Sequence, residues 1–180
     1  VLFLLHKIIN KGSIVKSTLK FLDLEFPEQL IVWAMRVWTR IGDEEASLHY
    51  ILRDGLSKAG ATNAYIDFDS TMTILNETSL LPYRTGCPDG CCENFQHLCA
   101  IEKIFLMTVS RLQSSSSIRV FHTNLNRFIT QKGMHLVDEP IKQLADSLYK
   151  SNIRLPIKDW DLEFDIEYSG ENMPQHRTFH

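Results

Sequence analysis

Four cysteines lie close together near the middle of the chain, and their side chains are the ones best suited to chemistry. They are Cys87, Cys91, Cys92 and Cys99. Thiolates bind zinc tetrahedrally, or hold an iron–sulfur cluster, when four of them converge. The Pro-Asp-Gly turn after Cys87 brings it toward Cys91, and His97 is able to replace one sulfur. The spacing therefore predicts a metal site, with zinc or an iron–sulfur cluster as the cofactor.

The same spacing leaves other interpretations of these cysteines open. On one helix, Cys92 and Cys99 would lie two turns apart, about 10 Å, so the loop would have to fold back for both to reach one ion. A redox-active thiol pair and ordinary buried or surface thiols are the alternatives. Glu102 lies at the edge of the apolar stripe that follows. It is either a buried acid serving the loop or, as is more common, a partly solvated glutamate.

A second candidate site is the segment Asp67-Phe68-Asp69-Ser70-Thr71. It resembles the D-x-D-x-T signature of the haloacid dehalogenase family of phosphatases. The resemblance implies a magnesium-dependent phosphatase in which Asp67 is the nucleophile and Asp69 the general acid and base. It also implies that Thr123 supplies a phosphate-binding hydroxyl and that Lys132 or Lys142 neutralises charge. Asp159 and Asp161 would be two further metal-binding aspartates.

The surroundings of this motif depart from that family. Its signature follows a buried strand, whereas only three apolar or aromatic residues, 64–66, precede Asp67. Ser70 stands where the family has glycine, and too few strands follow to build a sheet covered by helices on both faces. The alternative is a helix with Asp67 and Asp69 on its solvent face.

Helical periodicity dominates the chain between residues 26 and 150. In the first helix, opened by Pro27 and ended by Gly42, we expect Leu30, Ala34, Val37, Trp38 and Ile41 inward, and Arg36 and Arg40 away from that face. In the second, from about Glu44 to Gly60, we expect Leu48, Ile51, Leu52 and Leu56 inward, with Gly55 weakening the helix. Further helices are expected after caps at Thr62 and Asn94, the second ending at Ser114–Ser117. A helix or strand is expected over 118–129, an interruption at Gly133, and a last helix containing Ile141, Leu144, Ala145, Leu148 and Tyr149.

Composition and charge bound the class of protein. The chain has 180 residues and a formal net charge of −3 without any basic run, which argues against nucleic acid as a partner. No apolar run is long enough to cross a membrane. The apolar stretch Val1–Leu5 lacks the features of a signal peptide and is expected to pack on the core. We therefore expect a cytoplasmic protein whose partners are other proteins or copies of itself.

The end of the chain has a different pattern. From Trp160 to Tyr168, apolar and acidic residues alternate, which is typical of a half-buried strand. Such a segment pairs across a dimer, docks on a partner, or stays disordered because of its charge. The expected organisation is a helical domain over 1–158 and an acidic extension over 159–180.

The chain also resembles a group of small, uncharacterised helical proteins of proteobacteria. The resemblance covers most of residues 26–157. It rests on E-Q-L-I-V-W-A-M-R-V-W at 28–38, L-P-Y-R at 81–84 leading to Cys87 and Cys91, 102–113, and 145–148 followed by Ile153, Leu155 and Pro156. It implies an all-α fold, a bacterial source and a helix around Asp67, and it brings no activity.

Taken together, the sequence predicts an all-α protein: a compact bundle of about five to seven helices with a cysteine-rich loop and an acidic, alternating C-terminal strand or tail. The leading hypothesis is a binding or regulatory protein linked to a metal or to redox chemistry through Cys87–Cys99. One alternative is the phosphatase using Asp67 and Asp69. The other is a purely structural interaction module that acts through its C-terminal segment.

Overall fold

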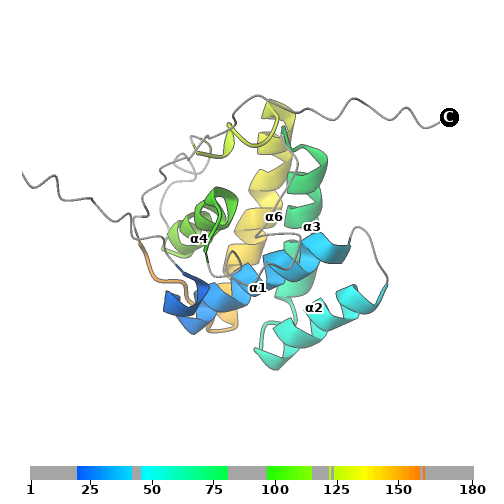
Figure 1. The fold of residues 1–180 in the computed structure, drawn as a ribbon, viewed down its shortest axis with the longest axis vertical. Coiled ribbons are helices and arrows are strands. Elements are labelled where there is room, and N and C mark those ends of the chain that lie inside the picture. The colour runs from blue at the N-terminus through cyan, green and yellow to red at the C-terminus, as the bar shows by residue number, and fades with distance from the viewer. Residues whose placement is uncertain are drawn as a thin grey trace, which may run out of the picture.

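The computed structural model describes residues 20–41, 46–80, 97–114, 122, 124–158 and 160. These residues form a helical bundle (Figure 1). Its elements are the 3₁₀ helix η1 (Phe21–Asp23) and the helices α1 (Phe26–Ile41), α2 (Ala46–Lys58), α3 (Ala64–Glu77), α4 (Ala100–Gln113) and α6 (Gln131–Lys150). Within the described ranges there is no strand, only two isolated bridges, Lys20–His97 and Ser79–Ile129. The all-α prediction is confirmed.

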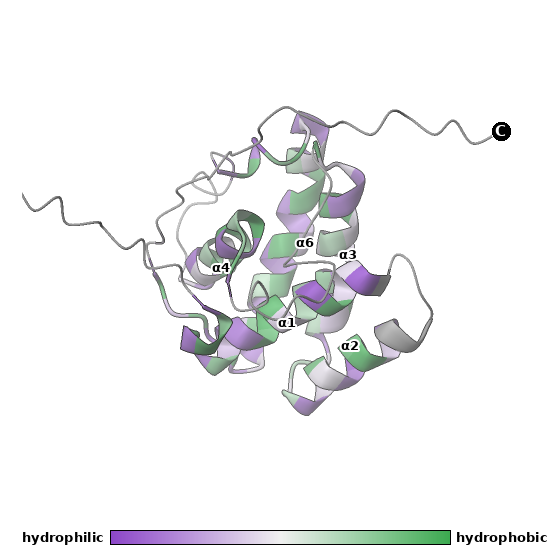
Figure 2. Cartoon of the chain, in the orientation of Figure 1, coloured by the Kyte–Doolittle hydropathy of each residue, from purple (hydrophilic) through white to green (hydrophobic). Residues whose placement is uncertain are grey.

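Helices α3 and α6 form the centre of the bundle (Figure 1). α6 buries apolar residues at helical spacing, among them Val137, Ile141 and Leu144. The predicted inward residues of α3 are all buried: Ala64, Phe68, Met72 and Leu75. α4 packs on α6, and its Phe105 meets Phe68 edge to face at 6.1 Å between ring centres. Hydrophobic and hydrophilic residues share each helix, as a bundle requires (Figure 2).

The expected interruption at Gly133 is wrong, because α6 runs through this residue without a break. The side chain of Thr130 caps the helix by accepting the Gly133 N–H at 3.2 Å. A Cβ on residue 133 would lie 2.5 Å from Cβ of Thr78, so only glycine lets the start of α6 approach the end of α3 this closely.

The expected placement of Arg36 is also wrong. Helix α1 contacts α2, α3, α4 and η1 (Figure 1), so it is buried on more than one side. Ile31, Val32 and Met35 are fully buried, and Arg36 is only 8% exposed. Arg40 is exposed, as expected. A single apolar stripe underestimates the buried face of a helix with neighbours on several sides.

Helix ends and inward residues follow the sequence in part. Gly60 ends α2 with φ of +80°, as its position predicts. Ile51, however, is 45% exposed, whereas Leu52 and Leu56 are fully buried. Helix α4 begins at Ala100 rather than directly after Asn94.

The expected extension over 159–180 falls outside the described residues, except for Trp160. So do the N-terminal residues 1–19 and the loop 81–96. In the part of the chain that is described, no helix is long and apolar enough to cross a membrane.

Candidate functional site

An open apolar groove lies between α1 and α2. The two helices run in opposite directions, with α2 returning beneath α1 (Figure 1). The groove has a volume of about 410 Å³. Its walls include Phe21 from η1, Phe26, Leu30 and Trp33 from α1, and Gly55 and Lys58 from α2. We call this feature the α1–α2 groove.

The floor of the α1–α2 groove depends on Gly55. A Cβ added at this position would overlap the indole of Trp33, at 2.6 Å from Cζ3. The absence of a side chain therefore lets the Trp33 ring lie directly against the backbone of α2. This contact explains a glycine within a helix, which costs about 1 kcal/mol relative to alanine.

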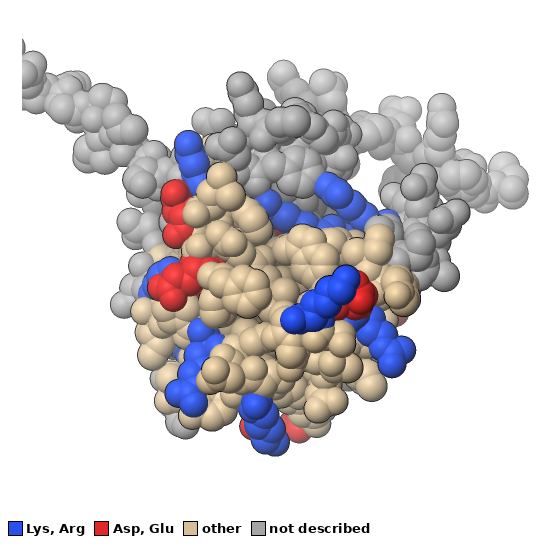
Figure 3. Space-filling view, turned by 90° about the horizontal axis from the view of Figure 1, so that it is seen from below, with Lys and Arg blue, Asp and Glu red and all other residues tan. Residues whose placement is uncertain are grey.

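Apolar surface continues beyond the groove. Leu22, beside the groove residue Phe21, is 74% exposed, and Phe26 is 63% exposed. Ile51, 45% exposed, lies one turn before Gly55 on the same side of α2. Seen from below, uncharged side chains cover much of this side of the molecule, with charged side chains standing among them (Figure 3). Exposed apolar side chains next to an apolar groove are typical of interaction sites.

Lys58 supplies a positive charge at the groove. Its Nζ lies 2.7 Å from the carboxylate of Asp54, one turn earlier on α2. The hydrogen bond from Lys58 to Asp54, together with the negative charge of that carboxylate, raises the pKa of Lys58 above its ordinary value. The amino group is therefore charged at every physiological pH.

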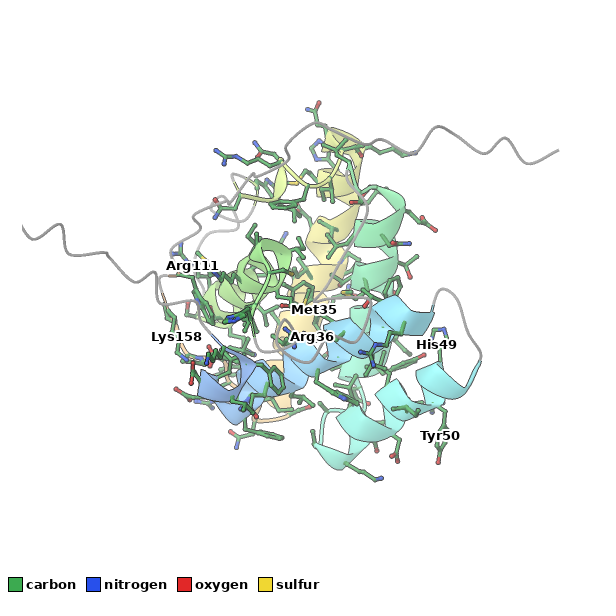
Figure 4. The ribbon with its side chains drawn as sticks, viewed as in Figure 1. Met35, Arg36, His49, Tyr50, Arg111 and Lys158 are labelled. Atoms are coloured by element: carbon green, nitrogen blue, oxygen red, sulfur yellow. The ribbon has the colours of Figure 1, made fainter. Side chains whose placement is uncertain are left out.

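A buried ion pair supports the Phe21 side of the groove. The Arg36 guanidinium lies 5.4 Å from the centre of the Phe21 ring. It donates to both oxygens of Glu102, from Nε at 2.7 Å and from Nη2 at 3.1 Å, and Nη2 also donates to the His97 carbonyl at 3.0 Å. Glu102 is fully buried. Arg36, labelled in Figure 4, thus joins α1 to the start of α4.

A second ion pair holds the beginning of α1. Glu28 is 1% exposed and accepts a hydrogen bond from Lys158 Nζ at 2.6 Å and one from the Glu25 N–H at 2.9 Å. Lys158, at the left of Figure 4, also lies 5.9 Å from the centre of the Trp160 ring. The segment after α6 is therefore tied to the helix that forms one wall of the groove. The other oxygen of Glu28, Oε1, is buried and has no hydrogen-bond partner among the described residues.

Of the predicted cysteine cluster, only Cys99 lies within the described residues. Cys99 is the half-buried N-cap of α4, and its N–H donates to Glu102 at 3.0 Å. Cys87, Cys91 and Cys92 fall outside the described residues, so the predicted metal site stays a prediction. The described residues contain no group of three or more histidine, cysteine or acidic side chains placed to hold a metal ion.

Glu102 is fully buried, so it is the buried acid of the two alternatives and not a partly solvated glutamate. Its partner Arg36 was missed. The signal available in the sequence is an arginine and a glutamate, each flanked by apolar residues within a strongly apolar helix.

The two aspartates of the phosphatase-like motif point to different neighbours. Both lie on a helix, α3, as the alternative expected, and they are half-buried rather than fully exposed. Asp67 accepts a hydrogen bond from the Ser147 hydroxyl at 2.7 Å, and Asp69 accepts one from the Trp38 indole at 2.7 Å. These bonds join α3 to α6 and to α1. The geometry therefore assigns the two carboxylates to packing and does not bring them together.

Of the other residues implied by the phosphatase resemblance, only the two lysines lie within the described residues. Lys132 and Lys142 are exposed on α6. Thr123, Asp159 and Asp161 fall outside the described residues.

One polar contact was not predicted. The ring of His49 lies 3.0 Å from the hydroxyl of Tyr65, which joins the start of α2 to α3. Burial, and secondly the negative charge of Asp69, raises the pKa of Tyr65 above its ordinary value. In Figure 4, His49 points inward, whereas the adjacent Tyr50 points away from the bundle. His49 and Tyr65 satisfy each other, so their contact stabilises the packing of the two helices.

Comparisons of the chain with known protein families, with curated proteins and with solved structures found no match.

Proposed function

We propose that this chain is a helical protein-binding module whose α1–α2 groove receives the apolar face of an amphipathic helix from a protein partner. The observation behind the proposal is the apolar groove of about 410 Å³, continued by exposed Leu22, Phe26 and Ile51. Burying such side chains against a partner removes apolar surface from water, at about 25 cal/mol per Å². Recognition of a helix in a groove is a recurrent way of using this surface.

The dimensions of the groove favour a helix. Phe26 and Trp33 on α1 are two turns apart, which is about 10 Å along the axis. A partner helix presents side chains at positions i, i+4 and i+7 over this same length. Lys58 is already paired with Asp54 at 2.7 Å, so the lining of the groove favours an apolar rather than an acidic partner face. The expected ligand is therefore a short amphipathic helix with a broad apolar face.

The test is selection of peptides from a displayed library of amphipathic sequences against the folded chain. Phe26→Glu serves for counter-selection, because residue 26 lines the groove and is 63% exposed. A glutamate is also favourable in the first turn of a helix. Tyr149→Glu is the matched control, because Tyr149 is 43% exposed and lies on α6, which does not line the groove.

We expect selected peptides with apolar residues at helical spacing, bound by the native chain and by Tyr149→Glu and at least tenfold more weakly by Phe26→Glu. Peptides that bind all three proteins equally, or no selected peptides at all, would show that the groove is not the binding surface.

A metal-linked binding role through the cysteine loop is a second proposal. It is supported by the neighbourhood of Cys99: Nδ1 of His97 is buried and has no hydrogen-bond partner in the described part of the chain. Elemental analysis of protein purified anaerobically tests it, beside the double variant Cys91→Ser, Cys92→Ser. Stoichiometric zinc or iron in the native protein alone would support the site. Its absence from both would end the proposal.

A further inference from the structure

We propose that the α1–α2 groove is occupied, in the absence of a partner, by the apolar N-terminal segment 1–9 of the same chain. This inference rests on the proposed function and adds a regulation to it, because the segment would compete with the partner helix. Residues 1–9 lie outside the described residues.

The segment 1–9 has the composition of a groove ligand. Its sequence is V-L-F-L-L-H-K-I-I, in which seven of nine residues are apolar. Val1, Leu4, Leu5 and Ile8 are spaced i, i+3, i+4 and i+7, the pattern by which an amphipathic helix presents one face to a groove. An apolar face of this kind needs a surface to cover it.

The attachment point favours this occupant. The described chain begins at Lys20, and the next residue, Phe21, is part of the groove wall. Residues 10–19 join the segment to this point. Ten residues reach about 33–36 Å when fully extended and have a root-mean-square span of about 17 Å as a flexible chain. Both lengths exceed the two turns of α1, about 10 Å, that separate Phe26 from Trp33.

Charge distinguishes this segment from the other terminal segment. Residues 1–19 contain three lysines and no acidic residue. Asp23 and Glu25, which flank the groove residues Phe21 and Phe26 in the sequence, are exposed, and Lys58 in the groove wall is paired with Asp54. Residues 161–168 contain four acidic residues, and their apolar residues alternate with period two, which does not suit a helix in a groove. The N-terminal segment is complementary in charge and in periodicity, whereas the C-terminal one is neither.

Because the segment is tethered close to the groove, weak binding is enough to keep the groove occupied. A short flexible linker gives an effective concentration of about 1 mM. If the untethered segment binds with a dissociation constant of about 0.1 mM, the ratio of occupied to empty grooves is about ten. The apparent affinity of the chain for a partner helix falls by the same factor, about tenfold.

A photo-crosslink in the full chain tests the docking directly. The reporter is p-benzoylphenylalanine in place of Phe3, irradiated at low protein concentration and mapped by mass spectrometry. We expect intramolecular crosslinks to 26–33 and 51–59. They should be lost when Phe26→Glu is added and kept when Tyr149→Glu is added. Crosslinks that map elsewhere, or that join two chains, would overturn the proposal, the latter outcome in favour of a second copy as the occupant.

Competition is tested with the double variant Leu4→Glu, Leu5→Glu of the full chain. A fluorescent peptide with the sequence of residues 1–9, measured by anisotropy, should bind this variant about tenfold more tightly than the native chain. Adding Phe26→Glu should abolish that gain. Equal affinity for the native chain and the double variant would refute the inference.

The two proposals fail in different ways. Displayed peptides that depend on Phe26 but bind the native chain and the Leu4→Glu, Leu5→Glu variant equally would leave the proposed function standing without this regulation. Crosslinks from position 3 to the groove, together with a library that selects no peptide, would show intramolecular docking and refute the binding of a partner helix.

Discussion

Glu102→Gln removes the negative charge of a fully buried carboxylate without changing its shape. In the native chain Glu102 accepts three hydrogen bonds, two from Arg36 at 2.7 and 3.1 Å and one from the Cys99 N–H at 3.0 Å. Arg36 is 8% exposed and Glu102 is 0% exposed, so water does not replace the lost partner. The substitution therefore removes the negative charge that Glu102 supplies to a buried guanidinium.

The magnitude follows from the three bonds. A glutamine oxygen in place of Oε1 keeps the bond from Arg36 Nε. Its amide group then faces two donors, Arg36 Nη2 and the Cys99 N–H, which lose their acceptor. Each unsatisfied buried donor costs about 1–3 kcal/mol, giving about 2–6 kcal/mol in total. Breaking a buried ion pair by removing one partner costs about 3–5 kcal/mol. We expect Glu102→Gln to lower the free energy of unfolding by about 4 kcal/mol.

Urea denaturation followed by circular dichroism measures this loss, since the midpoint and slope give the free energy of unfolding. The control is Asp146→Asn, which breaks the exposed Asp146–Lys150 pair, whose side chains are 57% and 73% exposed. It should cost less than about 0.5 kcal/mol. The double variant Arg36→Met, Glu102→Met replaces both charges by apolar groups and should recover most of the loss.

The reasoning would be refuted if Glu102→Gln cost no more than Asp146→Asn. That result would mean that water reaches the carboxylate and that the Arg36–Glu102 pair does not join α1 to α4. A double variant less stable than Glu102→Gln would instead show that Arg36 stabilises the bundle mainly through its other contacts.

Three further predictions concern the groove and its supports. Gly55→Ala should lower the free energy of unfolding, measured in urea, by about 1 kcal/mol. Overpacking against Trp33 costs about 1–3 kcal/mol, and alanine regains about 1 kcal/mol of helix propensity. A variant more stable than the native chain would show that the Trp33 ring moves aside freely. Lys158→Ala should lower the free energy of unfolding by about 1–3 kcal/mol, because the buried carboxylate of Glu28 loses the ammonium that it pairs with. Adding Glu28→Gln to this variant should restore part of the loss, and no recovery would contradict the pairing. Stability should fall as pH rises above about 10, because the folded state holds the Tyr65 proton more tightly than the unfolded state, owing to burial and then to a nearby aspartate. Tyr65→Phe should make this decline shallower, and an unchanged slope in urea titrations at high pH would contradict the assignment.

Local sequence patterns were sufficient to predict the helices. The inward residues of α3 recur every three or four positions, and the end of α2 at Gly60 follows from the positive φ that glycine adopts readily. These features depend on residues within one or two turns of each other. The start of α4 was misplaced because the bridge between Lys20 and His97, which precedes it, joins residues far apart in the sequence.

The candidate site could not be predicted in the same way. Its walls come from η1, α1 and α2, and the contact of Trp33 with Gly55 joins residues whose neighbourhood no local pattern encodes. In the sequence, Gly55 indicated only a weaker helix. The phosphatase-like motif illustrates the opposite case, since its spacing suggests a shared site while helix geometry directs Asp67 and Asp69 to different neighbours.

The sequence by itself determined the all-α class, the amphipathic helices and the apolar segment 1–9, because backbone propensity and the period of apolar residues act over a few residues. Only the tertiary structure decided that Arg36 is buried with Glu102 and that α1 and α2 leave an apolar groove between them. Burial depends on how many neighbours surround a helix, and pairing depends on distances between residues far apart in the chain. Both are properties of the packed bundle rather than of any one of its helices.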